Sequence, residues 1–362
     1  MAETPTFAAK PIAIPGRPAR SGTSQAWLWT TVALTVGAFG LAIATSPAAG
    51  AAPAYGLGWL LFVGSSVHIA GTGWLFSFRE VRAHAPERSA RYVIVPLALV
   101  AVSGVMATLL SPRDLAIVLL GYFGWQFFHF QKQNLGITAL AATALGLGPL
   151  TRLERWSILA TGWAGIAALM LHPGTLQLSL HPRRGWYPAV PFHVVTVGFV
   201  ASAAVGLVAL LQRPARDRPA GYCAAYLLAV GFPLPIFVFA SPYAAVGGMT
   251  IAHGLQYLVL VGMVTVGPRA GRRPVAQRIA LLAAAVLGGL GLNRASHLHT
   301  GGSVAHLIYG GYLGVVMAHF VVDAGIWRLR DRFPRSFLSA RLPSLLHPPP
   351  VSVPDASPAG VR

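Results

Sequence analysis

The sequence predicts an all-α fold: a polytopic integral membrane helical bundle of about ten transmembrane helices, with the N- and C-termini in the cytoplasm. Of the 362 residues, 55% are hydrophobic and only 10% are charged, whereas about a quarter of the residues in a soluble domain carry a charge. The chain has nine carboxylates, so long stretches contain none. The Lys and Arg residues gather between the apolar stretches, as they do in membrane proteins.

The apolar runs are long enough to cross a bilayer, because a helix needs about 20 residues to span about 30 Å of hydrocarbon. The ten expected spans are 26–49, 55–78, 92–110, 114–134, 156–172, 191–212, 219–240, 243–266, 276–293 and 303–326. The short apolar segment 135–148 is either a continuation of the fourth span or an interfacial piece. Pro233 and Pro235 predict a kink in the seventh span.

The loop charges set the expected orientation, since Lys and Arg are translocated with difficulty. With the N-terminus inside, 23 of the 27 basic residues fall on the cytoplasmic side. The other four are Arg113, Arg183, Arg184 and Arg294. This asymmetry predicts a multi-pass protein of the cytoplasmic (inner) membrane.

The formal net charge of +18 indicates a partner with negative charge. Because the Arg residues lie between apolar runs, we expect anionic lipid head groups and no nucleic acid. The tails 1–25 and 333–362 are rich in Pro, Ser and Ala, and we expect both to be disordered and cytoplasmic, flanking a transmembrane domain of 26–332. Cys223 is the only cysteine, which excludes a disulfide within the chain.

Four histidines fall in the middle or inner half of separate spans, where an ionisable side chain is costly and usually faces the bundle interior. They are His68, His129, His253 and His319. Polar residues share their helix faces: Gln126 and Gln133 lie near His129, and Gln256 and Tyr257 follow His253 by three and four residues. We therefore expect the four histidines to converge at one depth.

Asp323 lies one helical turn after His319 and is the only carboxylate in the interior of an expected span, since Asp114 is the first residue of its own. In one interpretation it orients His319 or relays protons in a metal site. In the other it lies at the inner interface and pairs with Arg328, for a gain of about 0 to 1 kcal/mol.

Several neutral imidazoles with few carboxylates suit non-haem iron or copper better than magnesium or calcium. The alternative for each histidine is a lone polar group that hydrogen-bonds across helices. One haem held between two helices, for example by His129 and His253, is a further alternative. His193, His297, His299 and His306 gather near the outer side, as a second metal site or as interfacial residues.

In plan, the chain resembles the Brp/Blh type of bacterial membrane β-carotene dioxygenase, on the basis of its polytopic form and of His68, His129, His253 and His319. The resemblance implies a helical membrane protein in which histidines from several helices hold iron beside a tunnel for a polyene. The histidine spacing and the ten spans depart from that family, so we carry over no functional residue.

These observations favour a membrane-embedded, metal-dependent oxidoreductase, an oxygenase that acts on a hydrophobic lipid or isoprenoid-like small molecule. His68, His129, His253 and His319 would be the metal ligands. Asp323, Gln133, Gln256 and Tyr257 would position ligands or reacting groups. The rivals are a proton-coupled transporter whose His, Gln and Asp residues line a polar path, and a haem-binding electron carrier.

Overall fold

The computed structural model describes residues 22–48, 51–178, 180, 189–268 and 274–346. Every regular element among them is a helix, which confirms the all-α prediction. The α-helices are Gly22–Ala44 (α1), Tyr55–Phe62 (α2), His68–Trp74 (α3), Arg79–His84 (α4), Val95–Leu109 (α5), Pro112–Ala144 (α6), Arg152–Leu171 (α7), Ala189–Gln212 (α8), Ala220–Gly231 (α9), Leu234–Val238 (α10), Gly248–Thr265 (α11), Pro274–Ser296 (α12), Ser303–Ile326 (α13), Arg332–Arg341 (α14) and Pro343–Leu346 (α15).

The chain is a multi-pass membrane protein by the length and composition of its helices. Within the described residues, seven continuous helical stretches are long and apolar enough to cross a membrane. They are Gly22–Ala44, Tyr55–Ser77, Ala90–Leu109, Val190–Gln212, Tyr243–Thr265, Pro274–Thr300 and Ser303–Ile326. Many of their large apolar side chains are exposed, as expected for surfaces that face lipid.

The other three of the ten expected spans are helical but are not among these seven stretches. The fourth span is part of α6, a helix of 33 residues that also takes in most of the segment 135–148. The fifth is α7, which begins with Arg152, Glu154 and Arg155. The seventh is divided near Pro233 into α9 and α10, because proline lacks the N–H that would continue the helix. The count of ten therefore stays a prediction.

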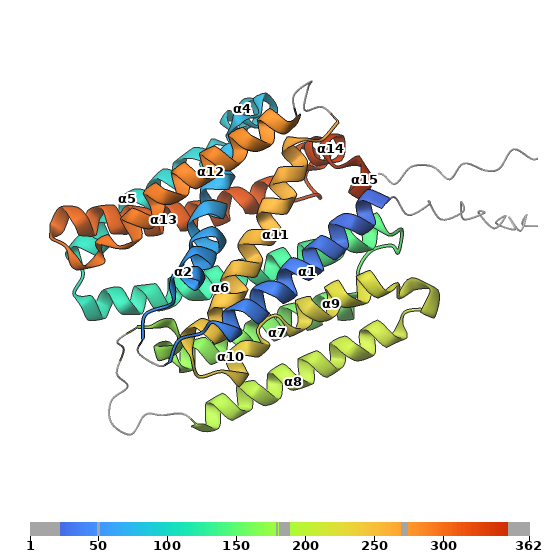
Figure 1. The fold of residues 1–362 in the computed structure, drawn as a ribbon, viewed down its shortest axis with the longest axis horizontal. Helices are drawn as coiled ribbons and strands as arrows, with labels where there is room; N and C mark the ends of the chain where they lie inside the picture. The colour runs from blue at the N-terminus through green and yellow to red at the C-terminus, as the bar shows by residue number, and fades with distance from the viewer. Residues whose placement is uncertain (1–21, 49–50, 179, 181–188, 269–273, 347–362) are drawn as a thin grey trace, which may run out of the picture.

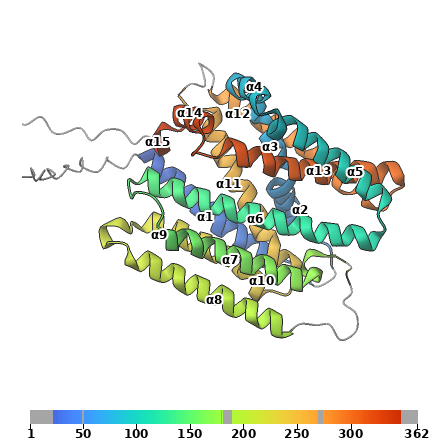
Figure 2. The same ribbon diagram turned by 180° about the vertical axis from the view of Figure 1, so that it is seen from behind.

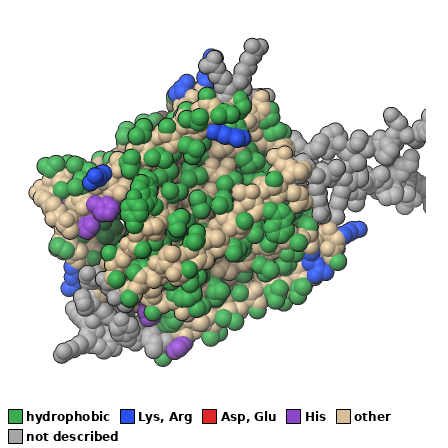
Figure 3. Space-filling model, in the orientation of Figure 1, with side chains coloured by type: hydrophobic (Ala, Val, Ile, Leu, Met, Phe, Trp, Pro, Cys, Tyr) green, Lys and Arg blue, Asp and Glu red, His purple; other side chains and the backbone are tan. Residues whose placement is uncertain are grey.

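The helices form two groups on either side of α11, which crosses the middle of the molecule (Figures 1 and 2). On one side α5 packs along α13, with α12 beside α13 and α3. On the other side α7 packs along α8, while α1 lies against α11 and α9. The space-filling view shows a surface dominated by apolar side chains, with the Lys and Arg residues near its edges (Figure 3). This is the surface that a bilayer requires.

Two π-helical segments and a close backbone approach bring α3 and α11 together. The segment Val63–Val67 directly precedes His68, and the segment Tyr243–Gly247 directly precedes α11. A Cβ atom on Gly254 would lie 2.5 Å from the carbonyl oxygen of Gly64, so a side chain there would force the backbones apart. π-helical turns are frequent at functional sites, and both segments here lie next to helices that carry buried histidines.

A buried ion pair joins the ends of α7 and α8 to α9. Arg213 Nη2 donates to Glu154 Oε2 over 2.8 Å, and the Tyr222 hydroxyl donates to Glu154 Oε1 over 2.8 Å. The backbone N–H of Thr151 donates to the same carboxylate over 2.7 Å, which completes a capping box at the start of α7. Burial raises the pKa of Glu154, but the hydrogen bonds from Arg213, Thr151 and Tyr222 outweigh it and hold that pKa below its usual value. We call these residues the Glu154 network.

The C-terminal part of the chain differs from the expected disordered tail. Residues 332–346 form α14 and α15, and Phe337 and Leu338 are buried against the bundle. The Arg341 guanidinium donates to Glu80 and lies 4.1 Å from the ring centre of Phe78. The amphipathic pattern of α14 explains the difference, because its apolar side chains fall on one face that can pack. The remainder of both expected tails, 1–21 and 347–362, lies outside the described residues.

Candidate metal centre

Four helices that are distant in sequence each contribute one histidine to a single buried cluster. His68 opens α3, His129 lies in α6, His253 in α11 and His319 in α13. We call these four residues the histidine cluster. His68, His253 and His319 are 3%, 0% and 3% exposed, and the His129 side chain is 12% exposed. The structure thus brings together all four histidines that the sequence singles out.

The four imidazole rings stand at the corners of a four-sided arrangement in which each ring neighbours two others. The ring centre of His68 lies 4.9 Å from that of His253 and 5.0 Å from that of His319. The ring centre of His129 lies 5.0 Å from that of His253 and 5.1 Å from that of His319. His253 and His319 are opposite corners, 6.5 Å apart. One nitrogen from each of His68, His253 and His319 lies within 4.8 Å of the others, a spacing that would allow them to share one ion.

The Nε2 atoms of all four histidines are buried and make no hydrogen bond with another described residue. Buried side-chain nitrogens are usually hydrogen-bonded, because an unmet polar atom costs about 1 to 3 kcal/mol. Four such atoms in one cluster are therefore expensive for a bundle that needs them only for stability. A shared ligand that accepts their lone pairs would remove this cost.

Asp323 and Tyr257 border the cluster, as their positions in the sequence suggest. Asp323 is 4% exposed, and its Oδ2 lies 3.6 Å from His319 Nδ1 and 3.9 Å from His129 Nε2. The Tyr257 hydroxyl donates to Asp323 Oδ1 over 2.9 Å. Arg328, the alternative partner of Asp323, forms its ion pair with Asp331 instead, at 3.7 Å. The geometry therefore places Asp323 beside the histidines and away from the interfacial arginine.

Thr72 links the carboxylate to the histidines and was not singled out by the sequence. Its hydroxyl lies 2.7 Å from the Tyr257 hydroxyl and 2.6 Å from His319 Nδ1. Thr72 follows His68 by one helical turn, so the two side chains share a face of α3. This four-residue spacing could have indicated Thr72 as a neighbour of the histidines. A threonine on a helix commonly bonds to the backbone of its own helix, however, so the spacing alone does not indicate a role in a site.

The number of protons available to the hydrogen bonds from Asp323 through Tyr257 and Thr72 determines the tautomer of His319. If Asp323 is ionised it only accepts, so the single Tyr257 proton points to Asp323. The Thr72 proton must then point to the Tyr257 oxygen, and His319 Nδ1 must donate to Thr72. This leaves the lone pair of His319 on Nε2, the atom that is buried without a hydrogen bond. A hydrogen bond at one imidazole nitrogen that frees the other for a metal is the usual arrangement of histidine ligands.

Gln133 and Gln256 lie next to the cluster but contact backbone and amide groups. Gln133 Nε2 donates to the His253 carbonyl over 2.9 Å and to Gln256 Oε1 over 3.0 Å. Gln256 Nε2 donates to Thr35 Oγ1 over 2.9 Å. These bonds join α1, α6 and α11. The hydrogen bonds of these two amides go to backbone, amide and hydroxyl groups, and the expected role of both glutamines in positioning ligands stays a prediction.

Aromatic rings cover the outer faces of the cluster. Phe130 stacks on His253 with ring centres 4.1 Å apart, and Phe320 stacks on His129 at 4.5 Å. Each of these phenylalanines covers one face of its imidazole with apolar surface. His129, with its partly exposed side chain, is the member of the cluster closest to the surroundings of the bundle.

The outer histidines do not converge in the same way. His297 Nδ1 lies 2.6 Å from the Asn293 carbonyl, His299 Nδ1 lies 3.2 Å from the Ser296 carbonyl, and His306 Nε2 lies 3.1 Å from the His299 carbonyl. Among the described residues, the groups spaced for a metal contain none of these three and not His193. Their bonds to backbone carbonyls favour the interfacial interpretation.

Comparison with known proteins adds no family to this description, since no family model, curated protein or solved structure matches the chain.

Proposed function

We propose that the histidine cluster binds one iron or copper ion and that the protein is a membrane-embedded oxidoreductase, an oxygenase that acts on a hydrophobic lipid or isoprenoid-like molecule. The observation that carries the proposal is the set of four buried Nε2 atoms without hydrogen bonds, on four different helices. Isolated histidines that join helices would each need a partner. Here the four Nε2 atoms have no hydrogen-bond partner among the described residues.

The spacing of the rings supports a shared ion. An imidazole nitrogen lies about 2.1 Å from a bound transition metal, which puts the ring centre about 3.2 Å from the ion. Neighbouring ring centres would then be about 4.5 Å apart in a square arrangement and about 5.2 Å apart in a tetrahedral one. The four neighbouring distances, 4.9 to 5.1 Å, lie between these values.

The same spacing weighs against haem. A haem between His129 and His253 would need a flat, open layer between the two imidazoles. His68 lies 4.9 Å from His253 and His319 lies 5.1 Å from His129, as close as the 5.0 Å between the His129 and His253 rings themselves, so the two added rings leave little room for that layer. We therefore propose a bare ion and keep haem as an outcome of the test below.

The donor set indicates which ion and which chemistry. Neutral imidazoles suit iron and copper, and one carboxylate nearby is too few for magnesium or calcium. Such an ion, when bound, would supply dioxygen chemistry. One such reaction is the oxidative cleavage of a carbon–carbon double bond. The double bond and O₂ become two carbonyl groups, so both oxygen atoms enter the products and no added reductant is needed. His319 would be a ligand through Nε2, while Thr72, Tyr257 and Asp323 hold the proton on its Nδ1.

A hydrophobic substrate fits the location of the cluster. The cluster lies within helices whose outer faces are apolar and exposed, so a substrate dissolved in the bilayer would approach from the side. Phe320 and Phe130 cover His129 and His253 with aromatic surface. Such a lining favours an apolar or polyene chain over a polar metabolite.

A proton-coupled transporter remains the second candidate, because Asp323, Tyr257, Thr72 and His319 form a continuous hydrogen-bonded chain. Such chains of buried polar groups are typical of proton paths in transporters. A transporter of this kind would need no metal, which makes the two candidates separable.

We also propose the finer topology: ten spans in the cytoplasmic membrane, with α6, α7 and the α9–α10 pair completing the seven long apolar stretches, and both termini inside. The distribution of Lys and Arg supports it. Reporter fusions after Arg82 and Arg216 should read cytoplasmic, and fusions at Pro112 and Arg294 should read external. One inverted early loop would refute this topology.

Metal analysis of the purified protein together with its optical spectrum tests the proposed function. We expect about one iron or copper ion per chain and no Soret band. A Soret band would instead assign a haem carrier. A chain that folds without metal, and gains none when iron or copper is added, would favour the transporter.

A further inference from the structure

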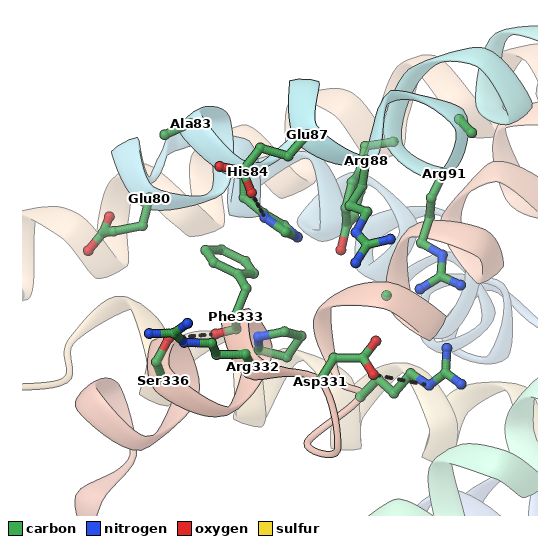
Figure 4. A pocket seen from close by; sticks show the side chains of 15 residues that line it. Glu80, Ala83, His84, Glu87, Arg88, Arg91, Asp331, Arg332, Phe333 and Ser336 are labelled. Atoms are coloured by element: carbon green, nitrogen blue, oxygen red, sulfur yellow. Dashed lines mark hydrogen bonds and ion pairs between the residues drawn. The ribbon is translucent and has the colours of Figure 1, made fainter.

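A cavity separate from the histidine cluster lies at the end of the bundle where α13 ends. Its volume is about 840 Å³, and it is lined by α4, by the following turns up to Tyr92, and by residues 328–336 (Figure 4). None of the four clustered histidines lines it. The ring of Phe333 stacks on His84 with ring centres 3.9 Å apart and forms part of its wall.

The acidic side chains around this cavity have basic partners. Glu87 bonds to His84 at 2.9 Å, and Asp331 pairs with Arg328 at 3.7 Å. Glu80 accepts from Arg341 at 2.9 Å. Their negative charge is therefore already balanced by nearby cations.

The positive charges of Arg88 and Arg91 are not paired with an acidic side chain among the described residues. Both residues line the cavity, and neither makes a hydrogen bond or ion pair with another described residue. Figure 4 shows the two side chains extending from the same wall toward the wall that carries Asp331. The forked N–H donors of a guanidinium group bind a phosphate or carboxylate in pairs, and this cavity is lined by two such groups.

The residues that follow Arg91 indicate where the ligand comes from. Val93, Ile94, Val95 and Leu97 are 42%, 59%, 40% and 63% exposed, on a helical stretch long and apolar enough to cross the membrane. An exposed apolar face that begins directly beside two unpaired arginines matches the shape of an amphiphile, with its anionic head at the arginines and its chains along the helix. A small soluble anion would leave the apolar face unused.

We propose that Arg88 and Arg91 bind the phosphate group of an anionic phospholipid whose acyl chains lie along residues 93–97. The cavity is large enough for a head group. Binding requires neither the metal nor the oxidoreductase activity, so it stands apart from the proposed function.

Native mass spectrometry of the full chain in neutral detergent tests this with phosphatidylglycerol as the probe. The variant Arg88→Gln/Arg91→Gln should bind phosphatidylglycerol about thirtyfold more weakly than the wild type, since each arginine near a membrane surface contributes a factor of about five to six. The control Arg79→Gln/Arg152→Gln removes the same charge from exposed positions outside the cavity and should bind as the wild type does. The milder variant Arg88→Lys/Arg91→Lys keeps the charge but lacks the forked donors, so it should lose part of the affinity. It keeps the proposal testable if the Gln variant fails to fold.

Inorganic phosphate forms the second arm of the experiment. We expect it neither to bind at matched concentration nor to displace phosphatidylglycerol. Full displacement would assign the arginines to a soluble phosphate ligand and overturn the lipid proposal. Equal losses in the cavity variant and in the control, or unchanged binding in the Gln and Lys variants, would also overturn it.

Discussion

The Glu154 network and the histidine cluster are both polar groups buried between helices, yet they satisfy their hydrogen bonds to different degrees. The Glu154 carboxylate accepts from Arg213, Tyr222 and the Thr151 backbone. The histidine cluster leaves four Nε2 atoms without a hydrogen bond. A network whose polar atoms are all hydrogen-bonded holds helices together, whereas a group of neighbouring rings with several unbonded nitrogens is suited to hold a ligand.

Their neighbours show the same contrast. Around Glu154 the opposite charge of Arg213 is in direct contact, so the pair is neutral without any other partner. Beside the histidines lies the Asp323 carboxyl group, which contacts His319 directly and is also linked to it through Tyr257 and Thr72. The Glu154 network should therefore control stability, and the histidine cluster should control metal content.

The largest expected effect is on metal content. His253→Ala or His129→Ala removes one proposed ligand from a four-ligand site, and should lower metal affinity by more than about a hundredfold, which exceeds the usual effect of residues that only orient ligands. Metal analysis of the purified variants checks this. The matched control is His172→Ala, whose ring packs against Phe192 away from the cluster. Full metal content in both cluster variants would show that the ligand assignment is wrong.

The second effect is on stability alone. Glu154→Gln leaves the buried Arg213 without its counter-charge, and should lower the free energy of unfolding by about 3 to 5 kcal/mol, with no change in bound metal. Denaturant unfolding in detergent measures it. The control Glu87→Gln breaks a pair with His84 in which the Glu87 side chain is 72% exposed, and should cost about 0 to 1 kcal/mol. A loss of metal in Glu154→Gln without a loss of stability would reverse the comparison.

Asp323→Asn is expected to lower metal affinity by less than the loss of a ligand does, and by more than a surface substitution does. The amide no longer accepts with a full negative charge, so the proton on His319 Nδ1 is held less firmly, and metal affinity should fall about tenfold to a hundredfold. Metal titration of Asp323→Asn beside Arg328→Gln measures this. Equal and small effects from both variants would mean that Asp323 acts as an interfacial charge.

Thr72→Val tests the hydrogen-bonded chain itself and should have a smaller effect. Valine keeps the shape but removes the acceptor for His319 Nδ1–H, so metal affinity should fall by about tenfold, the lower end expected for a group that orients a ligand. Thr72→Ser restores the hydroxyl and should recover most of the affinity. If Thr72→Val binds metal as tightly as the wild type, Asp323 acts on His319 without the threonine.

The smallest effect is the pH dependence of the Glu154 network. The pKa of Glu154 is lowered in the folded protein, so its contribution to stability is complete above its unfolded pKa of about 4.3. That contribution is lost as the pH falls through the lower folded value. Wild-type unfolding should therefore become easier below about pH 4, and Glu154→Gln should lack this part of the profile. Identical acid profiles for the two proteins would contradict the assignment.

The sequence predicted much of the histidine cluster because the cost of polar groups in hydrocarbon makes them rare. His68, His129, His253 and His319 stood out by depth alone. Thr72 did not, because a hydroxyl is common on membrane helices. The Glu154 network was missed as well, since nothing in the local sequence shows that Arg213, 59 residues further along, lies against Glu154.

The sequence by itself determined the all-helical, multi-pass character of the protein, because the apolar composition leaves no other way to satisfy the backbone in a membrane. It also determined which polar side chains must lie inside. Only the tertiary structure decided which of them meet: the Gly64 and Gly254 backbones approach closely enough for His68 and His253 to share a cluster. It also decided that Asp323 lies beside His319 while Arg328 pairs with Asp331. Hydrophobicity fixes the depth of a residue, whereas the packing between helices fixes its neighbours.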